Sequence, residues 1–290
     1  MTPVFLLVLL ACATDSGIVA QDVAPSYDRP YLQPEVAGVA YFPVAELRPA
    51  PTDEAAVARP GLMERINGIA RGRTQLEGGY AFLYNEAAGV RMAQHAVPDL
   101  LLRFGLTDRL EIRLGWPGYV ATDYDGPGLH RSSDDTLEPN VGFMLDLWPQ
   151  RGIRPQTAVS AAVPVTLEGN PFALDGLQPL AQLLYRWELT DRLALGGTTG
   201  MALFDAGGDD FLQLQQTAGL DYLCTVRLGV FGQWEMLVDH GSADDGARHM
   251  LGGGFSYLLT ERLQITWQAG LGLNEAAPDF LTDVRFAYRF

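Results

Sequence analysis

Apolar and polar residues alternate along most of the chain from Gln75 to Phe290. In the stretch Arg109–Trp116, Arg109, Glu111 and Arg113 interleave with leucine, isoleucine and tryptophan. A period of two over about eight residues indicates a β-strand with one apolar and one polar face. Twelve segments show this pattern, at about 75–85, 93–106, 109–121, 139–148, 155–166, 178–189, 192–204, 211–223, 226–238, 247–259, 262–273 and 279–290.

The connections between these segments alternate in length, which predicts the architecture. Three short connections share one motif, Phe104–Leu110 (FGLTDRL), Trp187–Leu193 (WELTDRL) and Tyr257–Leu263 (YLLTERL), and Tyr222–Leu228 (YLCTVRL) is a divergent copy. The other connections are mostly longer and more polar, and Thr122–Glu138 is the longest of these predicted outer loops. Short turns at one end, longer loops at the other and an even strand number are typical of outer-membrane barrels. The sequence therefore predicts an all-β fold, an antiparallel transmembrane β-barrel of about 12 strands over residues 75–290.

Aromatic residues recur at one offset before the short turns, in phase with the lipid-facing side of the strands. They are Phe104, Trp187, Tyr222 and Tyr257. Amphipathic rings are stable at the level of the lipid headgroups, so these four predict a membrane girdle and contact with outer-membrane lipid. A soluble sandwich or barrel with an aromatic core is the alternative. Phe286, Tyr288 and Phe290 share one face of the last strand and look like the signal that the barrel-assembly machinery recognises.

The N-terminal 74 residues follow a different pattern. Residues 4–12 are apolar, which is typical of an export signal, and we expect a signal peptide over 1–20 and a final location in the bacterial outer membrane. A lipobox ending at Cys12, with that cysteine lipidated, is the alternative. Residues 21–74 hold seven of the 18 prolines, which predicts a loop-rich lead-in that is either periplasmic or plugs the lumen.

Composition narrows the function classes. All 20 basic residues are arginine, and with 35 acidic residues the net charge is −15, which argues against nucleic-acid binding. We expect no cofactor. Acidic pairs could bind Ca²⁺ or Mg²⁺, but no EF-hand or Gly-Asp repeat supports a metal site, and a solvated acidic rim is favoured. These pairs are Asp123 with Asp125, Asp134 with Asp135, Asp209 with Asp210 and Asp244 with Asp245.

Charged residues within the strands fall on the face opposite the aromatic one. An arginine that faced lipid near mid-bilayer would cost roughly 2–4 kcal/mol, so we expect this face to line the lumen and the solute path. The lining residues predicted on this basis are Arg103, Arg109, Glu111, Arg113, Arg186, Glu188, Arg192, Arg227, Arg262, Asp283, Arg285 and Arg289. Glu77, Asp99, Asp146 and Glu235 share the same phase.

Two functions fit such a lumen. In the first, it is a wet pathway for small solutes, and arginines near the short turns form a positive belt that favours anions. Arg109, Arg192, Arg227 and Arg262 each begin the strand after a short turn. In the second, arginine–carboxylate pairs close the lumen around the lead-in and leave a structural or surface-interaction barrel.

An enzymatic role is the third hypothesis. His130 with Ser132, and His240 with Ser242, have the His-x-Ser spacing of outer-membrane phospholipases, in which a histidine activates a serine. Both pairs lie in predicted outer loops, and the Asn-Gly that follows the serine in those enzymes is absent. We therefore favour a non-enzymatic protein over an outer-membrane lipid hydrolase.

Four stretches resemble the transporters grouped as "MetA-pathway of phenol degradation" proteins: Gly72–Tyr80, Leu102–Trp116, Gly252–Leu263 and Gly270–Phe280. The resemblance spans about residues 59–290. An Asp-Arg-Pro…Glu motif precedes the first strand in that family, and here Arg59-Pro60 and Glu64 match it while Ala58 replaces the aspartate. The resemblance implies an outer-membrane barrel that acts as a porin or transporter for small solutes, aromatic or anionic.

Overall fold

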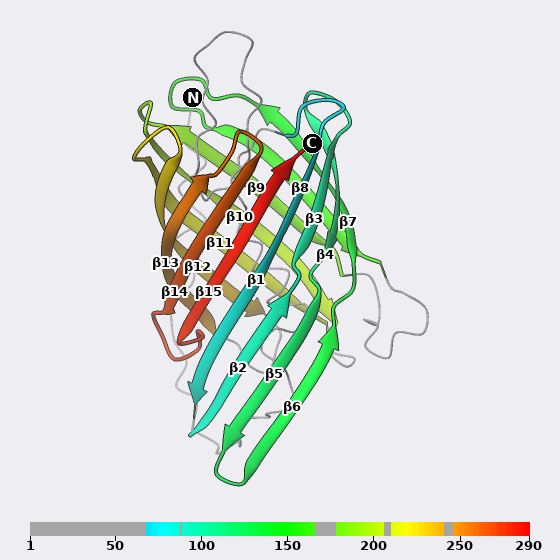
Figure 1. The fold of residues 1–290 in the computed structure, drawn as a ribbon, viewed down its shortest axis with the longest axis vertical. Helices are drawn as coiled ribbons and strands as arrows, with labels where there is room; N and C mark the ends of the chain where they lie inside the picture. The colour runs from blue at the N-terminus through cyan, green and yellow to red at the C-terminus, as the bar shows by residue number, and fades with distance from the viewer. Residues whose placement is uncertain (1–67, 88, 166–177, 206–209, 241–245) are drawn as a thin grey trace. The chain divides into compact units, whose positions relative to one another are not determined.

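The computed structural model describes residues 68–87, 89–165, 178–205, 210–240 and 246–290. In this part of the chain, 15 strands form one antiparallel sheet that closes on itself because β15 pairs with β1 (Figure 1). The strands are β1 (Thr74–Ala87), β2 (Val90–Val97), β3 (Leu100–Gly105), β4 (Leu110–Trp116), β5 (Tyr119–Gly126), β6 (Leu129–Thr136), β7 (Asn140–Trp148), β8 (Gln156–Pro164), β9 (Leu180–Glu188), β10 (Leu193–Asp205), β11 (Asp210–Leu223), β12 (Leu228–His240), β13 (Ala247–Leu258), β14 (Leu263–Gly272) and β15 (Phe280–Arg289). Among the described residues, no helix is long and apolar enough to cross a membrane.

Proline residues interrupt three strands of the barrel wall. Pro98 separates β2 from β3, Pro117 separates β4 from β5, and Pro139 lies between β6 and β7. Proline has no N–H to donate, so the ladder stops there. Gly118 has a φ of +90°, and an added Cβ would contact the carbonyl of Pro98, so this interruption requires glycine. Counting each interrupted pair as one strand gives a 12-stranded barrel, which confirms the predicted number.

Most of residues 122–138, predicted to be an outer loop, instead form the hairpin β5–β6. Together with β2 it extends the wall beyond the rest of the barrel (Figure 1). Its inner face is mixed, with Val120, Thr122 and Tyr124 buried, whereas Asp123 and His130 are exposed on its outer face. The loop prediction was wrong because this hairpin stands outside the membrane, where the outward positions of a strand do not have to be apolar.

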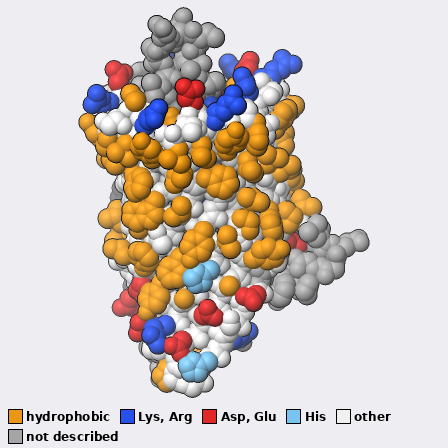
Figure 2. Space-filling view, viewed as in Figure 1, with side chains coloured by type: hydrophobic (Ala, Val, Ile, Leu, Met, Phe, Trp, Pro, Cys, Tyr) orange, Lys and Arg blue, Asp and Glu red, His pale blue; other side chains and the backbone are white. Residues whose placement is uncertain are grey.

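The outer surface of the barrel wall is apolar and the inner surface is polar. Figure 2 shows a broad band of hydrophobic side chains across the visible face of the barrel and charged side chains gathered towards its two ends. Large exposed apolar side chains include Leu114, Leu195, Leu251, Leu271 and Val284. The buried side chains of the interior include Gln75, Gln94, Gln213 and Gln264, each at most 1% exposed. Since a soluble barrel has the opposite polarity, this fold is a transmembrane barrel.

One threonine organises each of the four short turns. Its hydroxyl oxygen accepts hydrogen bonds from the backbone N–H groups two and three residues later, at 3.2 and 3.0 Å in every copy. The threonines are Thr107, Thr190, Thr225 and Thr260, so the divergent fourth copy forms the same turn. We call this end of the barrel the turn end and the opposite end the loop end. In outer-membrane barrels the turn end faces the periplasm.

The predicted girdle residues lie near the turn end on the outer side of their strands. Phe104, Tyr222 and Tyr257 are exposed, and the half-buried Trp187 donates its indole N–H to the carbonyl of Ile153 at 2.7 Å. Phe286 and Phe290 are also exposed, and the rings of Tyr288 and Phe290 meet edge to face with centroids 5.0 Å apart.

The seam between the first and last strands is fully paired. Gln75–Tyr84 of β1 are in register with residues 280–289 of β15, and the Phe290 N–H donates to the Thr74 carbonyl at 3.0 Å. A closed sheet has no edge at which detergent can open it. We therefore expect the purified protein to migrate faster on SDS gels when unheated than after boiling. Equal mobility of the two samples, or a helical circular dichroism spectrum, would contradict the closed barrel.

Candidate functional site

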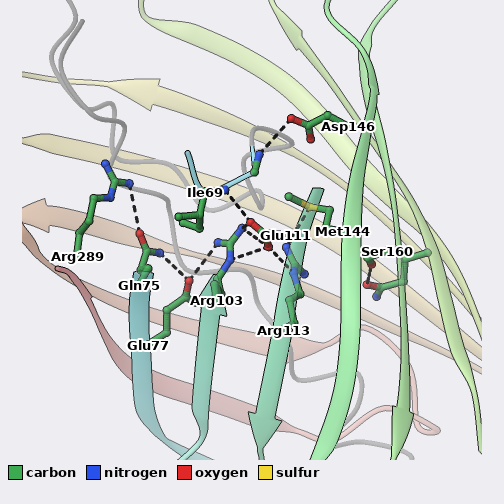
Figure 3. A network of polar contacts seen from close by, with 12 residues as sticks. Ile69, Gln75, Glu77, Arg103, Glu111, Arg113, Met144, Asp146, Ser160 and Arg289 are labelled. Atoms are coloured by element: carbon green, nitrogen blue, oxygen red, sulfur yellow. Dashed lines mark hydrogen bonds and ion pairs between the residues drawn. The ribbon is translucent and has the colours of Figure 1, made fainter. Parts of the chain in front are cut away.

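Buried ion pairs join neighbouring strands on the inner face of the barrel wall near the turn end (Figure 3). Glu111 on β4 is fully buried and accepts two hydrogen bonds from Arg103 on β3, both at 2.9 Å, and one from Arg113 Nε at 2.6 Å. Arg103 also donates to Glu77 Oε1 on β1 at 3.2 Å. The forked contact between Arg103 and Glu111 is the strongest common geometry for such a pair.

Uncharged groups continue this network on both sides. Gln75 donates to Glu77 at 2.7 Å and accepts from Arg289 at 3.3 Å, so the network reaches the seam with β15. On the other side, an Arg113 nitrogen lies 3.0 Å from the Met144 sulfur on β7. Charges removed from water are tolerated only when paired and hydrogen-bonded, which this arrangement provides.

The chain segment that leads into β1 lies against this network inside the barrel (Figure 3). The Ile69 N–H donates to Glu111 Oε2 at 2.8 Å, and the Gly68 N–H donates to Asp146 Oδ2 at 3.2 Å. The Ile69 side chain is buried. Gly105 on β3 allows this close approach, because an added Cβ would collide with the backbone carbonyls of Ile69 and Ala70. Two carboxylates and one glycine of the wall thus hold residues 68–73, which we call the inner segment.

The remainder of the lead-in, residues 21–67, lies outside the described residues. So do the predicted signal peptide over 1–20 and Cys12. Their predicted roles therefore stay predictions, and only the end of the lead-in is placed, beside the barrel wall.

Other arginines on the inner side of the strands are also paired with carboxylates. Arg186 contacts Asp221 at 2.5 Å, and Arg248 contacts Asp239 at 2.6 Å. Arg285 contacts Asp99 at 2.7 Å and Asp283 at 3.5 Å. The strand residues predicted to face the lumen are thus buried on the inner side of the wall: Arg103, Glu111, Arg113, Arg186, Asp283, Arg285 and Arg289. Their role in a solute path stays a prediction.

Five of the predicted lining residues are not part of this interior. Arg109, Arg192, Arg227 and Arg262 are exposed on the short turns, outside the strands, and Glu188 is exposed at the last position of β9. Placing these four arginines on the lumen face of the strands was wrong because the period of two holds only while the backbone is extended, and these turns reverse the chain. The prediction considered only charged residues and therefore missed Gln75. Its spacing of two from Glu77 could have indicated that Gln75 faces the interior.

The residues considered for catalysis and for metal binding lie elsewhere. His130 and Ser132 are exposed on the outer side of β6, and His130 Nδ1 lies 2.8 Å from Asp125 Oδ1 on β5. His240 ends β12, while Ser242 is outside the described residues. Within the part of the chain that the structure describes, no group of three or more His, Cys, Asp or Glu residues could hold a metal ion.

Comparisons with solved structures identify similar folds. The chain resembles an outer membrane channel from Pseudomonas putida F1 with a TM-score of 0.61 and 13% identity, covering 78% of this chain and 98% of that one. The NanC porin gives 0.48 at 8% identity (75% and 100% covered), and the CymD monoaromatic hydrocarbon channel gives 0.43 at 10% (76% and 89% covered). At these identities the likeness concerns the fold.

No curated protein matches the sequence significantly. Residues 72–290, however, match the family described as "Putative MetA-pathway of phenol degradation". With most of its length matched, and with a closed outer-membrane-type barrel as its fold, the chain belongs to this family.

Proposed function

We propose that this protein is an outer-membrane channel for small solutes whose turn end, facing the periplasm, is narrowed by the inner segment. The observation that carries the proposal is the way this segment is held. Gly68 and Ile69 donate backbone hydrogen bonds to Asp146 and Glu111, Gly72 and Arg73 pair with the backbone of Gly105, and Ile69 is the one buried apolar side chain of the segment. These contacts are few beside the hydrogen-bond ladders of the wall, so the segment can be displaced without unfolding the barrel.

An aromatic solute is the finer part of this proposal. The family description refers to phenol degradation. The interior towards the loop end supports it, since Leu83, Met92, Val120, Tyr124 and Leu281 form a buried apolar cluster there. Apolar and aromatic side chains with a few polar groups are the usual lining of sites for such solutes.

The four turn arginines do not support a preference for anions, because they are exposed on the turns and do not line the interior. We expect the triple variant R109Q/R192Q/R262Q to keep the ion selectivity of the wild-type barrel, because exposed charges are screened within about 8–10 Å at ordinary salt. Reversal potentials measured under a salt gradient in planar bilayers test this. A clear loss of anion selectivity in the triple variant would show that the turn arginines do act on the permeating ions.

The second candidate is a closed structural or surface-interaction barrel, and the buried arginine–carboxylate pairs favour it. Planar-bilayer recording on the purified protein separates the two. Discrete conductance steps support the channel, and their absence from a correctly folded barrel supports the closed form. We propose no enzymatic activity for either, because His130 and Ser132 lie exposed on the outer side of the β5–β6 hairpin.

A further inference from the structure

The turn between β7 and β8, at the turn end, places two arginines side by side. Arg151 and Arg154 form a backbone bridge, in which each N–H donates to the other's carbonyl, at 3.0 and 3.1 Å. Gly152, with a φ of +58°, and Ile153 form the tip between them. Residues directly opposite each other in an antiparallel bridge project their side chains to the same face. The two guanidinium groups therefore leave the turn from neighbouring positions on one face.

This face is the outward, lipid-facing one. Arg154 Cζ lies over the ring of Trp148, 5.2 Å from the ring centre. Trp148, the last residue of β7, pairs with Thr157, which in turn pairs with Tyr185 on β9. Both chain neighbours of Tyr185 are buried on the inner side, so Tyr185 faces outward and Trp148 does the same. The arginine that stacks on Trp148, and its partner across the bridge, therefore lie on the outer side of the wall.

Contacts with β9 hold the backbone of this turn in place. The indole N–H of Trp187 donates to the Ile153 carbonyl at 2.7 Å. The side-chain amide of Gln150 donates to the Glu188 carbonyl at 3.2 Å and accepts from the Glu188 N–H at 2.7 Å. The two arginines are thus presented by a backbone that is fixed before any ligand arrives, which lowers the entropy cost of binding.

The charge of this arginine pair is not balanced by the protein. Within the described part of the chain, no carboxylate lies within ion-pair distance of Arg151 or Arg154. Like charges directly opposite each other across a bridge are destabilising, and an anion between them removes that cost. Guanidinium groups match the oxygens of a phosphate through forked hydrogen bonds. The pair is therefore suited to a phosphate group.

The surroundings of the pair favour a phosphate that carries acyl chains. Ile153 is 94% exposed, and Trp148 is 39% exposed beside it. Amphipathic rings such as tryptophan are stable at the level of the lipid headgroups, which is where phospholipid phosphates lie. Figure 2 shows arginine side chains along the turn-end edge of the hydrophobic band. A phosphate held at this edge can lay its acyl chains on the apolar outer surface of the wall.

We propose that Arg151 and Arg154 form a binding site for the phosphate of an anionic phospholipid in the periplasmic leaflet of the outer membrane. Both arginines donate hydrogen bonds to the phosphate oxygens, and the Trp148 ring orients Arg154. A headgroup with no positive charge of its own is preferred, because an ammonium or choline group would be repelled by the two arginines. The site does not depend on the proposed channel function, since a conducting and a closed barrel would bind the lipid alike.

Native mass spectrometry of the full-length protein, released from detergent micelles, tests the site. The protein is titrated with phosphatidylglycerol or with phosphatidylcholine of the same acyl chains. We expect the first phosphatidylglycerol to bind at least about fivefold more tightly. An excess of sn-glycerol 3-phosphate, a phosphate without acyl chains, should not displace it. Equal affinity for the two lipids, or displacement by glycerol 3-phosphate, would overturn the proposal.

A pair of double variants locates the binding. R151Q/R154Q removes both charges at the exposed turn and should weaken phosphatidylglycerol binding about tenfold, while phosphatidylcholine binding stays unchanged. R227Q/R262Q is the matched control, because it removes the same charge from two other exposed turns that carry one arginine each. It should bind both lipids like the wild type. Equal losses in the two double variants would mean that the overall charge of the turn end attracts the lipid, and the proposed site would be wrong.

Trp148→Leu provides a second test with both arginines retained. It removes the ring on which Arg154 is stacked and should weaken phosphatidylglycerol binding about threefold. Heat-dependent gel mobility shows whether each variant has folded. If folded R151Q/R154Q and Trp148→Leu both bind phosphatidylglycerol like the wild type, the lipid binds elsewhere and the proposal fails.

Discussion

Gly105→Val is expected to raise the single-channel conductance of the barrel several-fold. The added side chain would occupy the position of the Ile69 and Ala70 carbonyls, which are backbone atoms and cannot rotate away. Residues 68–70 of the inner segment would then have to leave the wall, although the Gly105 N–H could still donate to the Arg73 carbonyl. Because the segment narrows the turn end in the proposed channel, displacing it should widen the path. Planar-bilayer recording measures the effect.

Gly232→Val is the matched control. Gly232 is exposed on the outer side of β12, and the nearest atom to an added Cβ there is 3.9 Å away, so its conductance should equal that of the wild type. Asp146→Ala is a second route to the same result, because it removes the acceptor of the Gly68 N–H without adding bulk. If both Gly105→Val and Asp146→Ala fold and conduct like Gly232→Val, the inner segment does not limit the path.

Arg103→Met is expected to lower the free energy of unfolding by about 3–5 kcal/mol, the usual cost of removing one partner from a buried ion pair. Arg103 is 1% exposed and bridges Glu77 and Glu111, so its loss leaves two buried carboxylates with fewer donors. Arg109→Met makes the same chemical change on an exposed turn and should alter stability by less than about 0.5 kcal/mol. Urea unfolding of both variants in lipid vesicles compares them.

The double variant R103M/E111M sharpens this test. Removing both partners should cost less than the sum of the two single changes, because neither group is then left buried alone. Additive losses would mean that Arg103 and Glu111 do not stabilise the fold as a pair. A loss in Arg109→Met as large as that in Arg103→Met would show that the effect comes from the overall charge.

The sequence alone predicts the faces of the strands but not the pairs that form between them. Alternation places Arg103, Glu111 and Arg186 on the inner side, because an arginine cannot face lipid. Their partners depend on strand register, which the alternation leaves open. Arg186 on β9 reaches Asp221 on β11 across β10, where its paired neighbour is Gly196, a residue with no side chain in the way.

The errors of prediction lie at the ends of the strands. At the turn end, Arg109 continues the alternation in sequence, but the hydroxyl of Thr107 accepts bonds from the backbone N–H groups of Arg109 and Leu110, and the chain has already turned. At the loop end, the β5–β6 hairpin leaves the membrane, and the rule that outward residues are apolar no longer applies.

The seam between β1 and β15 also determines when the barrel can form. Arg289 and Gln75, which contact each other across it, are 214 positions apart in the chain. The chain is made and exported from its N-terminus, so β1 is synthesised long before β15, its partner at the seam. Contacts this distant in sequence form slowly. The β1 edge therefore stays unpaired until β15 has been made, and an unpaired edge strand is a site where other chains can add.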